Sequence, residues 1–238
     1  MCCPAPGEKI DRVILGLCTS HNSRLGKETQ FSKGRLVVRI TEDDDLTSMS
    51  CVKKAIKIMY EYRHLPILVW VSIPCTGGSS WQRLNYAMGK ITAEQLQAHF
   101  TLYGKLMKSA YRICLVGRRF GAKIALEWPK LCSYWKDQAY IRFSSEFQLH
   151  SIILDGCMFG LKAQSGADAG KYIKKPWRID TDLDSLDEYL GIQCDNSHEH
   201  TRCAGQHTKL TEGYTDQMVA AVHSGFQTWS ERERRAAG

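Results

Sequence analysis

The sequence predicts an α/β protein built on a mostly parallel β-sheet, with a small appendage towards its C-terminal end. Short apolar runs rich in β-branched residues alternate with segments of helical periodicity, and this alternation favours parallel strands joined by helical crossovers. A length of 238 residues suits one such domain with an appendage, or two small domains. We therefore expect a domain over residues 8–182 and a Cys/His-rich appendage over residues 183–230, whose final helix packs back on the core.

Strands are expected where short apolar runs are bounded by polar or turn-forming residues. The run at 67–73 is the clearest, because it is continuously apolar like a strand buried on both faces. The same criteria place the other strands at 11–17, 35–41, 121–126, 151–158 and 175–181.

Helices are expected where apolar residues recur at every third or fourth position, at 48–62, 93–113 and 215–229. The second helix has a capping box formed by Thr92 and Gln95. Its expected buried face consists of Leu96, Phe100, Tyr103, Met107 and Ala110. The first helix is expected to begin at a cap formed by Asp45 or Thr47. Both would serve as crossovers between parallel strands.

Charge and cysteine content limit the classes of partner and compartment. The formal net charge of +7 favours a polyanionic partner such as nucleic acid. No apolar run approaches the roughly 18 residues of a membrane span, so no membrane association is expected. Because the N-terminus does not read as a signal peptide, we expect reduced cysteines and a reducing compartment, either cytoplasm or nucleus. The pattern gives no indication of the oligomeric state.

Two polar residues at predicted strand ends are the candidate catalytic pair. Cys75 follows the strand at 67–73 and precedes two glycines, which allow a sharp turn that leaves the thiol facing a crevice. Glu127 ends the next predicted strand. The carboxyl ends of adjacent parallel strands lie about 5 Å apart, so the thiol and the carboxylate are expected to converge. The alternatives are an ordinary buried thiol at Cys75 and a capping or surface carboxylate at Glu127.

These segments resemble a known enzyme family. Pro74-Cys75 with Ser79 is similar to the nucleophile loop of S-adenosylmethionine-dependent DNA cytosine-5 methyltransferases, and Glu127-Trp128-Pro129 resembles their Glu-Asn-Val motif. The resemblance covers residues 11–181 and implies a Rossmann-like domain. It also implies that Cys75, with a lowered pKa, adds to C6 of cytosine while Glu127 binds N3 and the exocyclic amine. The same segments resemble uncharacterised reading frames of protist mobile elements.

The resemblance also implies a cofactor site and a base contact. The matching cofactor-binding positions are Cys18, Thr19, Ser20, Ser23, Glu42, Asp45 and Pro74. Glu42 or Asp45 would hold the ribose and adenine, although the family's glycine-rich pattern is missing from the first loop. Arg178 would contact the target base, or it would pair with Asp180 or Asp182 on the surface. Residues 214–219 lie where the last helix of the family packs back on the cofactor site.

The appendage contains a candidate zinc site. Five possible ligands fall within fourteen residues: Cys194, His198, His200, Cys203 and His207. Thiolates and imidazoles suit tetrahedral zinc, and their short spacing lets one loop surround the ion. The spacing matches neither a standard zinc finger nor the H-E-x-x-H helix of metalloproteases. A structural zinc site, a polar loop without metal and a catalytic zinc remain as alternatives.

Three functions from different classes are compatible with these features. The first is methyl transfer from S-adenosylmethionine to C5 of cytosine in nucleic acid, most simply DNA. The second is a non-enzymatic, basic nucleic-acid-binding protein of a mobile element that keeps the same scaffold. The third is a cysteine-nucleophile hydrolase or transferase with His21 as its base, which requires a contact between imidazole and thiol.

Overall fold

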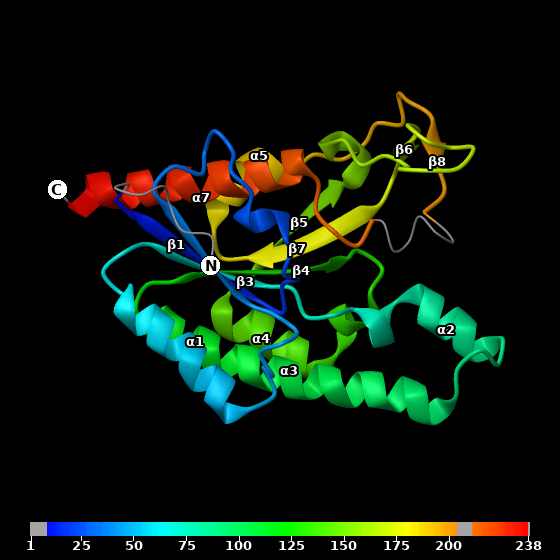
Figure 1. The fold of residues 1–238 in the computed structure, drawn as a ribbon, viewed down its shortest axis with the longest axis horizontal. Coiled ribbons are helices and arrows are strands. Elements are labelled where there is room, and N and C mark those ends of the chain that lie inside the picture. The colour runs from blue at the N-terminus through cyan, green and yellow to red at the C-terminus, as the bar shows by residue number, and fades with distance from the viewer. Residues whose placement is uncertain (1–8, 204–210, 238) are drawn as a thin grey trace.

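The protein is described here by a computed structural model, which covers residues 9–203 and 211–237. A central β-sheet has helices on both of its faces (Figure 1). Its strands are β1 (Arg12–Leu17), β2 (Arg35–Ile40), β3 (Ile67–Val71), β4 (Lys123–Pro129), β5 (His150–Asp155) and β7 (Pro176–Thr181). All six predicted strands are confirmed. The predicted strand at 151–158 ends early because Gly156–Phe159 forms a 3-10 turn.

The order of strands in this six-stranded sheet is β2-β1-β3-β4-β7-β5. The first four are parallel, whereas β7 runs antiparallel to both of its neighbours. The α/β class and the mostly parallel sheet are therefore confirmed. From β1 the chain moves first to one side, to β2, and later to the other side, to β3. This reversal creates a topological switch point between the carboxyl ends of β1 and β3.

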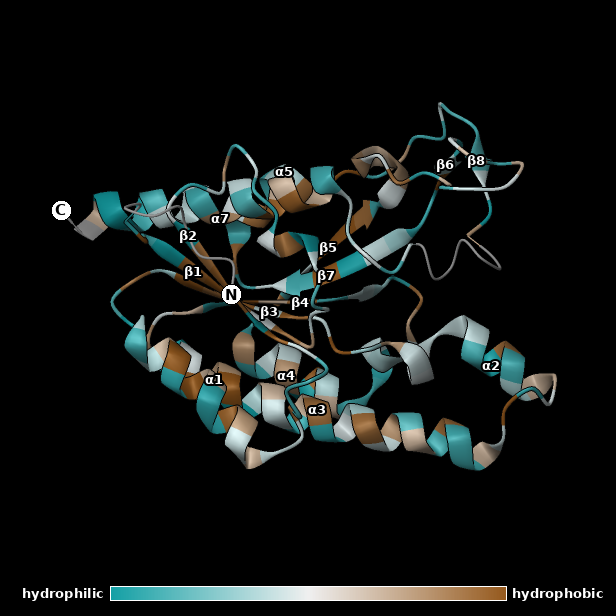
Figure 2. Ribbon diagram, viewed as in Figure 1, coloured by the Kyte–Doolittle hydropathy of each residue, from teal (hydrophilic) through white to brown (hydrophobic). Residues whose placement is uncertain are grey.

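Helices cover both faces of the sheet. They are α1 (Met49–Glu61), α2 (Ser80–Ala87), α3 (Ala93–Arg119), α4 (Gln138–Phe147), α5 (Asp187–Leu190) and α7 (Asp216–Ala237). In Figure 1, α1, α3 and α4 lie on one side of the sheet and α5 and α7 on the other. Hydrophobic and hydrophilic residues alternate along α1 and α3, as expected of helices that bury one face (Figure 2). None of the helices among the described residues is both long and apolar enough to cross a bilayer.

The two predicted crossover helices are confirmed, with corrections at their ends. Ser48, and not Asp45 or Thr47, caps α1, because its hydroxyl accepts from the amide of Cys51. Thr92 and Gln95 form the expected capping box of α3. Leu96 and Phe100 were expected on the buried face of α3, yet Leu96 is half-buried and Phe100 is 36% exposed, because only the later turns of this helix contact the sheet.

The C-terminal helix packs against the sheet as the sequence predicts. Its inward residues Met218, Val219, Val222 and Phe226 join one buried cluster with Trp70 of β3. A separate two-stranded sheet joins β6 (Tyr172–Ile173), which precedes β7, to β8 (His200–Thr201) of the Cys/His-rich region.

His223 fixes α7 to the loop that follows β1. Its Nε2 lies 2.9 Å from the carbonyl of Leu25 and must donate, so Nδ1 accepts from the hydroxyl of Thr29 at 3.1 Å. Burial, followed by the nearby charge of Arg35, lowers the pKa of His223 to about 3. The imidazole is therefore neutral in the native protein at neutral pH.

This lowered pKa predicts a loss of stability in acid. Between the unfolded pKa of about 6.5 and the native pKa of about 3, only the unfolded chain binds the proton. The free energy of unfolding should therefore fall by up to about 1.4 kcal/mol for each pH unit below 6.5. Urea unfolding at pH 7, 6 and 5 measures this slope. The slope reports the number of protons that the chain takes up on unfolding. This number should fall by about one in His223→Gln and stay unchanged in His64→Gln, which alters an exposed histidine. Equal slopes in all three proteins would contradict the assignment.

Candidate functional site

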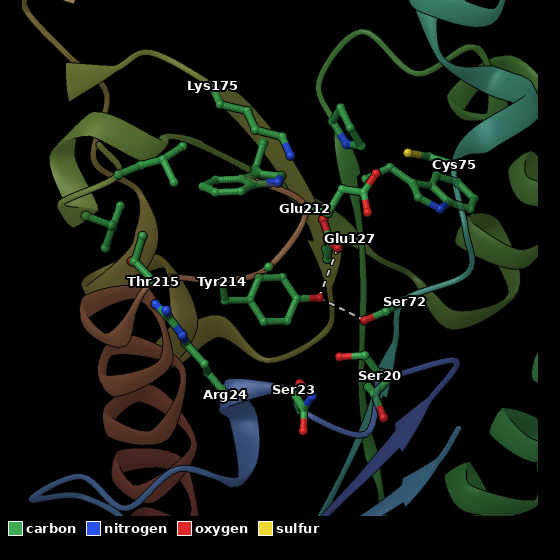
Figure 3. A pocket seen from close by; sticks show the side chains of 18 of the residues that line it. Ser20, Ser23, Arg24, Ser72, Cys75, Glu127, Lys175, Glu212, Tyr214 and Thr215 are labelled. Atoms are coloured by element: carbon green, nitrogen blue, oxygen red, sulfur yellow. Dashed lines mark hydrogen bonds between the residues drawn. The ribbon is translucent and has the colours of Figure 1, made fainter. Parts of the chain in front are cut away.

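A cavity of about 810 Å³ opens at the carboxyl ends of β1, β3 and β4. Its walls come from the loop after β1, the loop after β3, the end of β4 and the segment before α7 (Figure 3). It thus lies at the switch point of the strand order, where open α/β sheets bind their ligands. Its volume is within the usual range of small-molecule and cofactor sites.

Tight packing of two glycines positions Cys75 at this cavity. Cys75 directly precedes the 3-10 turn Thr76–Gly78. A Cβ atom on Gly77 would lie 2.5 Å from the hydroxyl oxygen of Tyr134, and one on Gly78 would lie 2.6 Å from Sγ of Cys132. Larger residues would therefore displace this turn. This packing agrees with the predicted role of the glycines. They let the chain turn so that the thiol reaches a crevice.

The Cys75 thiol and the Glu127 carboxyl group line the same cavity. Burial, followed by the charge of Glu127, raises the pKa of Cys75 to about 11, although the charge of Lys175 opposes the shift. The expectation of a lowered thiol pKa is therefore wrong for the free protein. Burial raises the pKa of this thiol by more than the charge of Lys175 lowers it, so the thiol is protonated at neutral pH.

A hydrogen-bond network around the Tyr214 hydroxyl holds Glu127 in place (Figure 3). This hydroxyl donates to Oε1 of Glu127 at 2.9 Å. It lies 3.0 Å from Nε1 of Trp70, which can only donate, and 2.8 Å from Oγ of Ser72. A phenol has one donor and two acceptor positions, so Ser72 donates as well and all three positions are used.

The second carboxyl oxygen of Glu127 is buried and, within the described part of the chain, unpartnered. Oε2 is covered by the protein and has no hydrogen-bond partner among the described residues. Burial raises the pKa of Glu127 above its usual value, with Lys175 and the Tyr214 hydroxyl opposing the shift. A buried carboxyl group with a free oxygen and a raised pKa is suited to exchange a proton or a hydrogen bond with a bound molecule.

The structure separates the predicted cofactor residues into two groups. Those that line the cavity are Cys18, Thr19, Ser20, Ser23 and Pro74. Glu42 and Asp45 are exposed and do not line it. Asp45 instead accepts hydrogen bonds from the amide and hydroxyl of Thr47 before α1. Residues 41–48 form a loop between β2 and α1, and Glu42 and Asp45 are exposed to solvent in it.

Two other sequence predictions are not met by the geometry. Arg178 does not line the cavity; it pairs with Asp180 through Nε and Nη2 at 2.7 and 2.6 Å and lies over the ring of Trp135. The alternative of a pair with Asp180 is therefore the observed one. His21 bonds to Asp43 at 2.8 Å and does not line the cavity, so it offers no imidazole to Cys75.

The cavity contains charged and hydroxyl residues that sequence reasoning did not single out. Lys175 lies across Glu127 from Cys75 in Figure 3 and donates to the carbonyl of Thr211 at 2.6 Å. Arg24, Lys162 and Glu212 also line the walls. No local sequence pattern singles out Lys175. It is one of two consecutive lysines in a loop, where lysine is common and gives no indication of function. Tyr214 belonged to a segment matched to the family's cofactor site, but its bond to Glu127 depends on a contact across 87 residues.

A group of thiols and imidazoles lies in the Cys/His-rich region. Cys157, Cys194, His198 and His200 place their ligand atoms within 4.8 Å of one another and could hold a metal ion. Three of these were predicted, whereas Cys157 was missed because it lies 37 residues before Cys194. Cys203 is not part of the group, since its Sγ contacts the hydroxyl of Thr211 at 3.2 Å. His207 lies outside the described residues.

Comparisons with known proteins give no family for this chain. No protein-family model matches it, and no curated protein is similar to it in sequence.

The Tyr214 network predicts a loss of stability when the hydroxyl is removed. Tyr214→Phe leaves the buried Nε1 of Trp70 without its acceptor and Glu127 without its donor. We expect the free energy of unfolding to fall by about 1–3 kcal/mol, measured by urea denaturation. Tyr86→Phe removes a hydroxyl from a side chain that is 47% exposed and should change stability by less than about 0.5 kcal/mol. Similar losses in both variants would exclude a special role for Tyr214.

The raised pKa of Cys75 predicts slow alkylation. At pH 8 the thiolate fraction should be of the order of 100-fold lower than for a thiol of pKa 9, so iodoacetamide should label Cys75 slowly and faster towards pH 11. Mass spectrometry of the Cys75 peptide measures the rate. Glu127→Gln should accelerate labelling, because it removes a negative charge, whereas the exposed Glu94→Gln should not. A labelling profile centred at or below pH 9 in the unmodified protein would refute this assignment.

Proposed function

We propose that this protein transfers a methyl group from S-adenosylmethionine to C5 of a cytosine in nucleic acid, on a Rossmann-like domain. The proposal depends on one observation: a thiol and a buried carboxyl group, Cys75 and Glu127, face the same cavity at the ends of neighbouring parallel strands. The crevice at the switch point of the sheet is the expected position for such a site.

Cys75 is suited to make the ring carbon reactive. C5 of cytosine is not nucleophilic until a thiolate adds at C6 and the electrons of the C5–C6 double bond move towards C5. The thiol is protonated in the free protein, so it must lose its proton when the substrate binds. Lys175 lowers the pKa of Cys75 and would stabilise the thiolate once the cavity is closed by its ligand.

Glu127 is suited to accept the charge that this addition creates. When protonated, its free Oε2 can donate to ring N3, which becomes more basic as Cys75 adds at C6. Tyr214 keeps the other oxygen fixed. Transfer of the methyl group to C5 would break its bond to the sulfonium sulfur and leave S-adenosylhomocysteine. Loss of the C5 proton, cleavage of the C6–sulfur bond and return of the N3 proton to Glu127 would then restore the ring. Overall, the C5 hydrogen is exchanged for a methyl group and one proton is released.

The cavity fits the proposed cofactor only in part. S-adenosylmethionine, when bound, would supply the electrophilic methyl group. The hydroxyls of Thr19, Ser20 and Ser23 line the cavity at the end of β1 and are suited to bind a nucleoside, and the buried Oγ1 of Thr19 has no partner among the described residues. The carboxylates expected to bind the ribose and adenine, Glu42 and Asp45, lie elsewhere, so they are not part of this proposal.

Positive charge supports a nucleic-acid substrate. The net charge is +7, and Arg24, Lys162 and Lys175 line the cavity, where they can meet phosphate groups. A cytosine within a duplex would have to leave the base stack to reach Cys75, so we infer a flipped base, most simply in DNA. A free thiol nucleophile also requires a reducing compartment, and we place the protein in the cytoplasm or nucleus as part of this proposal.

A second candidate is a nucleic-acid-binding protein without transferase activity. Two observations favour it: the pKa of Cys75 is raised to about 11, and the expected carboxylates of the cofactor site are outside the cavity. In this function the same basic surface would bind nucleic acid in a salt-dependent manner, and the cavity would bind no cofactor.

Covalent trapping tests the first function against the second. The full chain is incubated with S-adenosylmethionine and a DNA duplex containing 5-fluorocytosine, which blocks release because C5 carries no hydrogen. We expect a denaturation-resistant protein–DNA adduct with the unmodified protein and none with Cys75→Ser. Glu127→Gln should reduce adduct formation by about 100-fold or more, because it removes the proton donor.

The control is Cys51→Ala, which removes a thiol from α1 that does not line the cavity and should leave the adduct unchanged. A thermal-shift measurement with S-adenosylmethionine gives a second result, since a ligand at 100 times its Kd adds about 2.7 kcal/mol of stability. An adduct that forms equally well with Cys75→Ser would refute the catalytic role. Salt-dependent DNA binding with neither adduct nor thermal shift would favour the second candidate.

A further inference from the structure

Four side chains from three separate segments converge beside the two-stranded sheet. Cys157 lies in the 3-10 turn after β5, Cys194 in the loop after α5, His198 in the same loop and His200 on β8. Their ligand atoms all lie within 4.8 Å of one another. Both thiols are buried and both imidazoles are half-buried.

The measured separations match those around tetrahedral zinc. Zinc lies about 2.3 Å from sulfur and about 2.05 Å from nitrogen, so at a tetrahedral angle the two ligand atoms are about 3.6 Å apart. Sγ of Cys194 lies 3.5 Å from Nε2 of His200 and 3.8 Å from Nε2 of His198. Both imidazoles therefore present the same nitrogen to this sulfur at the spacing that a shared ion requires.

Backbone hydrogen bonds also fix the position of Cys194. The amide of Asn196 lies 3.3 Å from its Sγ and donates to it. Asn196 has a left-handed φ of 63°, a conformation that asparagine adopts more readily than most residues and that helps to turn the loop around the sulfur. The amide of Cys194 donates to Asp155 at 2.9 Å, which ties this loop to the end of β5. Such contacts around the ligands orient them for a metal.

We propose that Cys157, Cys194, His198 and His200 form a structural zinc site. Two thiolates and two imidazoles complete the tetrahedral coordination that zinc prefers, so no position remains for water or substrate. This ligand group differs from the one that sequence spacing indicated, because Cys157 replaces Cys203. It does not depend on the proposed methyltransferase function.

The site would also support one wall of the functional cavity. Cys157 belongs to the same 3-10 turn as Phe159, and Phe159, Gly160 and Leu161 line the cavity. The strands β6 and β8 pair in parallel over two residues each, Tyr172 with His200 and Ile173 with Thr201. A metal ion would therefore join a weakly paired loop region to the sheet and hold the cavity wall in position.

Metal analysis of the full chain tests this proposal without any enzyme assay. Protein purified in reducing buffer and freed of loosely bound metal should contain one zinc per chain by mass spectrometry. Cys157→Ser and Cys194→Ser should lose most of this zinc. Cys203→Ser is the matched control, because that thiol contacts Thr211 and not the group, and it should keep the zinc. Cys75→Ser should keep it too, which separates this result from failure of the proposed function.

A second measurement needs no variant. Cobalt(II) bound to the unmodified protein should show the intense visible absorption of tetrahedral coordination and a sulfur-to-cobalt charge-transfer band. Zinc retained in Cys157→Ser and lost in Cys203→Ser would overturn the ligand assignment. A zinc-free chain with octahedral cobalt, or with a disulfide between Cys157 and Cys194 in non-reducing peptide mapping, would overturn the site itself.

Discussion

The buried hydroxyl of Tyr214 is the interaction on which the site depends. It joins the segment before α7 to β3 through Trp70 and Ser72 and to β4 through Glu127, so three parts of the chain share one oxygen atom. Burial strengthens these hydrogen bonds. It also removes water from Glu127, so the other carboxyl oxygen of this residue has no partner among the described residues. The cavity and the environment of Glu127 thus both result from the packing of α7 against the sheet.

Burial, more than local charge, determines the protonation of the candidate catalytic pair. Removal from water is the largest cause of the raised pKa of both Cys75 and Glu127, and the opposing charge of Lys175 does not reverse it. In the free protein the pair therefore holds its protons more tightly than the same groups in water. Any chemistry at Cys75 would have to begin with a ligand that alters this balance, which links reactivity to binding.

The cavity and the Cys/His cluster meet at the turn after β5. Cys157 and Phe159 are two residues apart, yet one belongs to the cluster and the other to the cavity wall. The two sites therefore share a short, buried backbone segment, whose position depends on the loops that surround it. The Cys/His-rich region therefore contacts the same turn that lines the cavity, although the two are far apart in the sequence.

Local patterns predicted the six strands of the main sheet and the helices α1, α3 and α7, but not α2, α4, α5 or the pair of β6 and β8. Long-range contacts determined the sites. The apolar runs fixed all six strands, and their order along the chain placed Cys75 and Glu127 at neighbouring strand ends, because parallel strands share an edge. Cys157, Tyr214 and Lys175 could not be found in this way, since each acts through partners far along the chain. Arg178 and Glu42 showed the converse error: residue type suited a role, but only the tertiary structure decides which partner a side chain reaches.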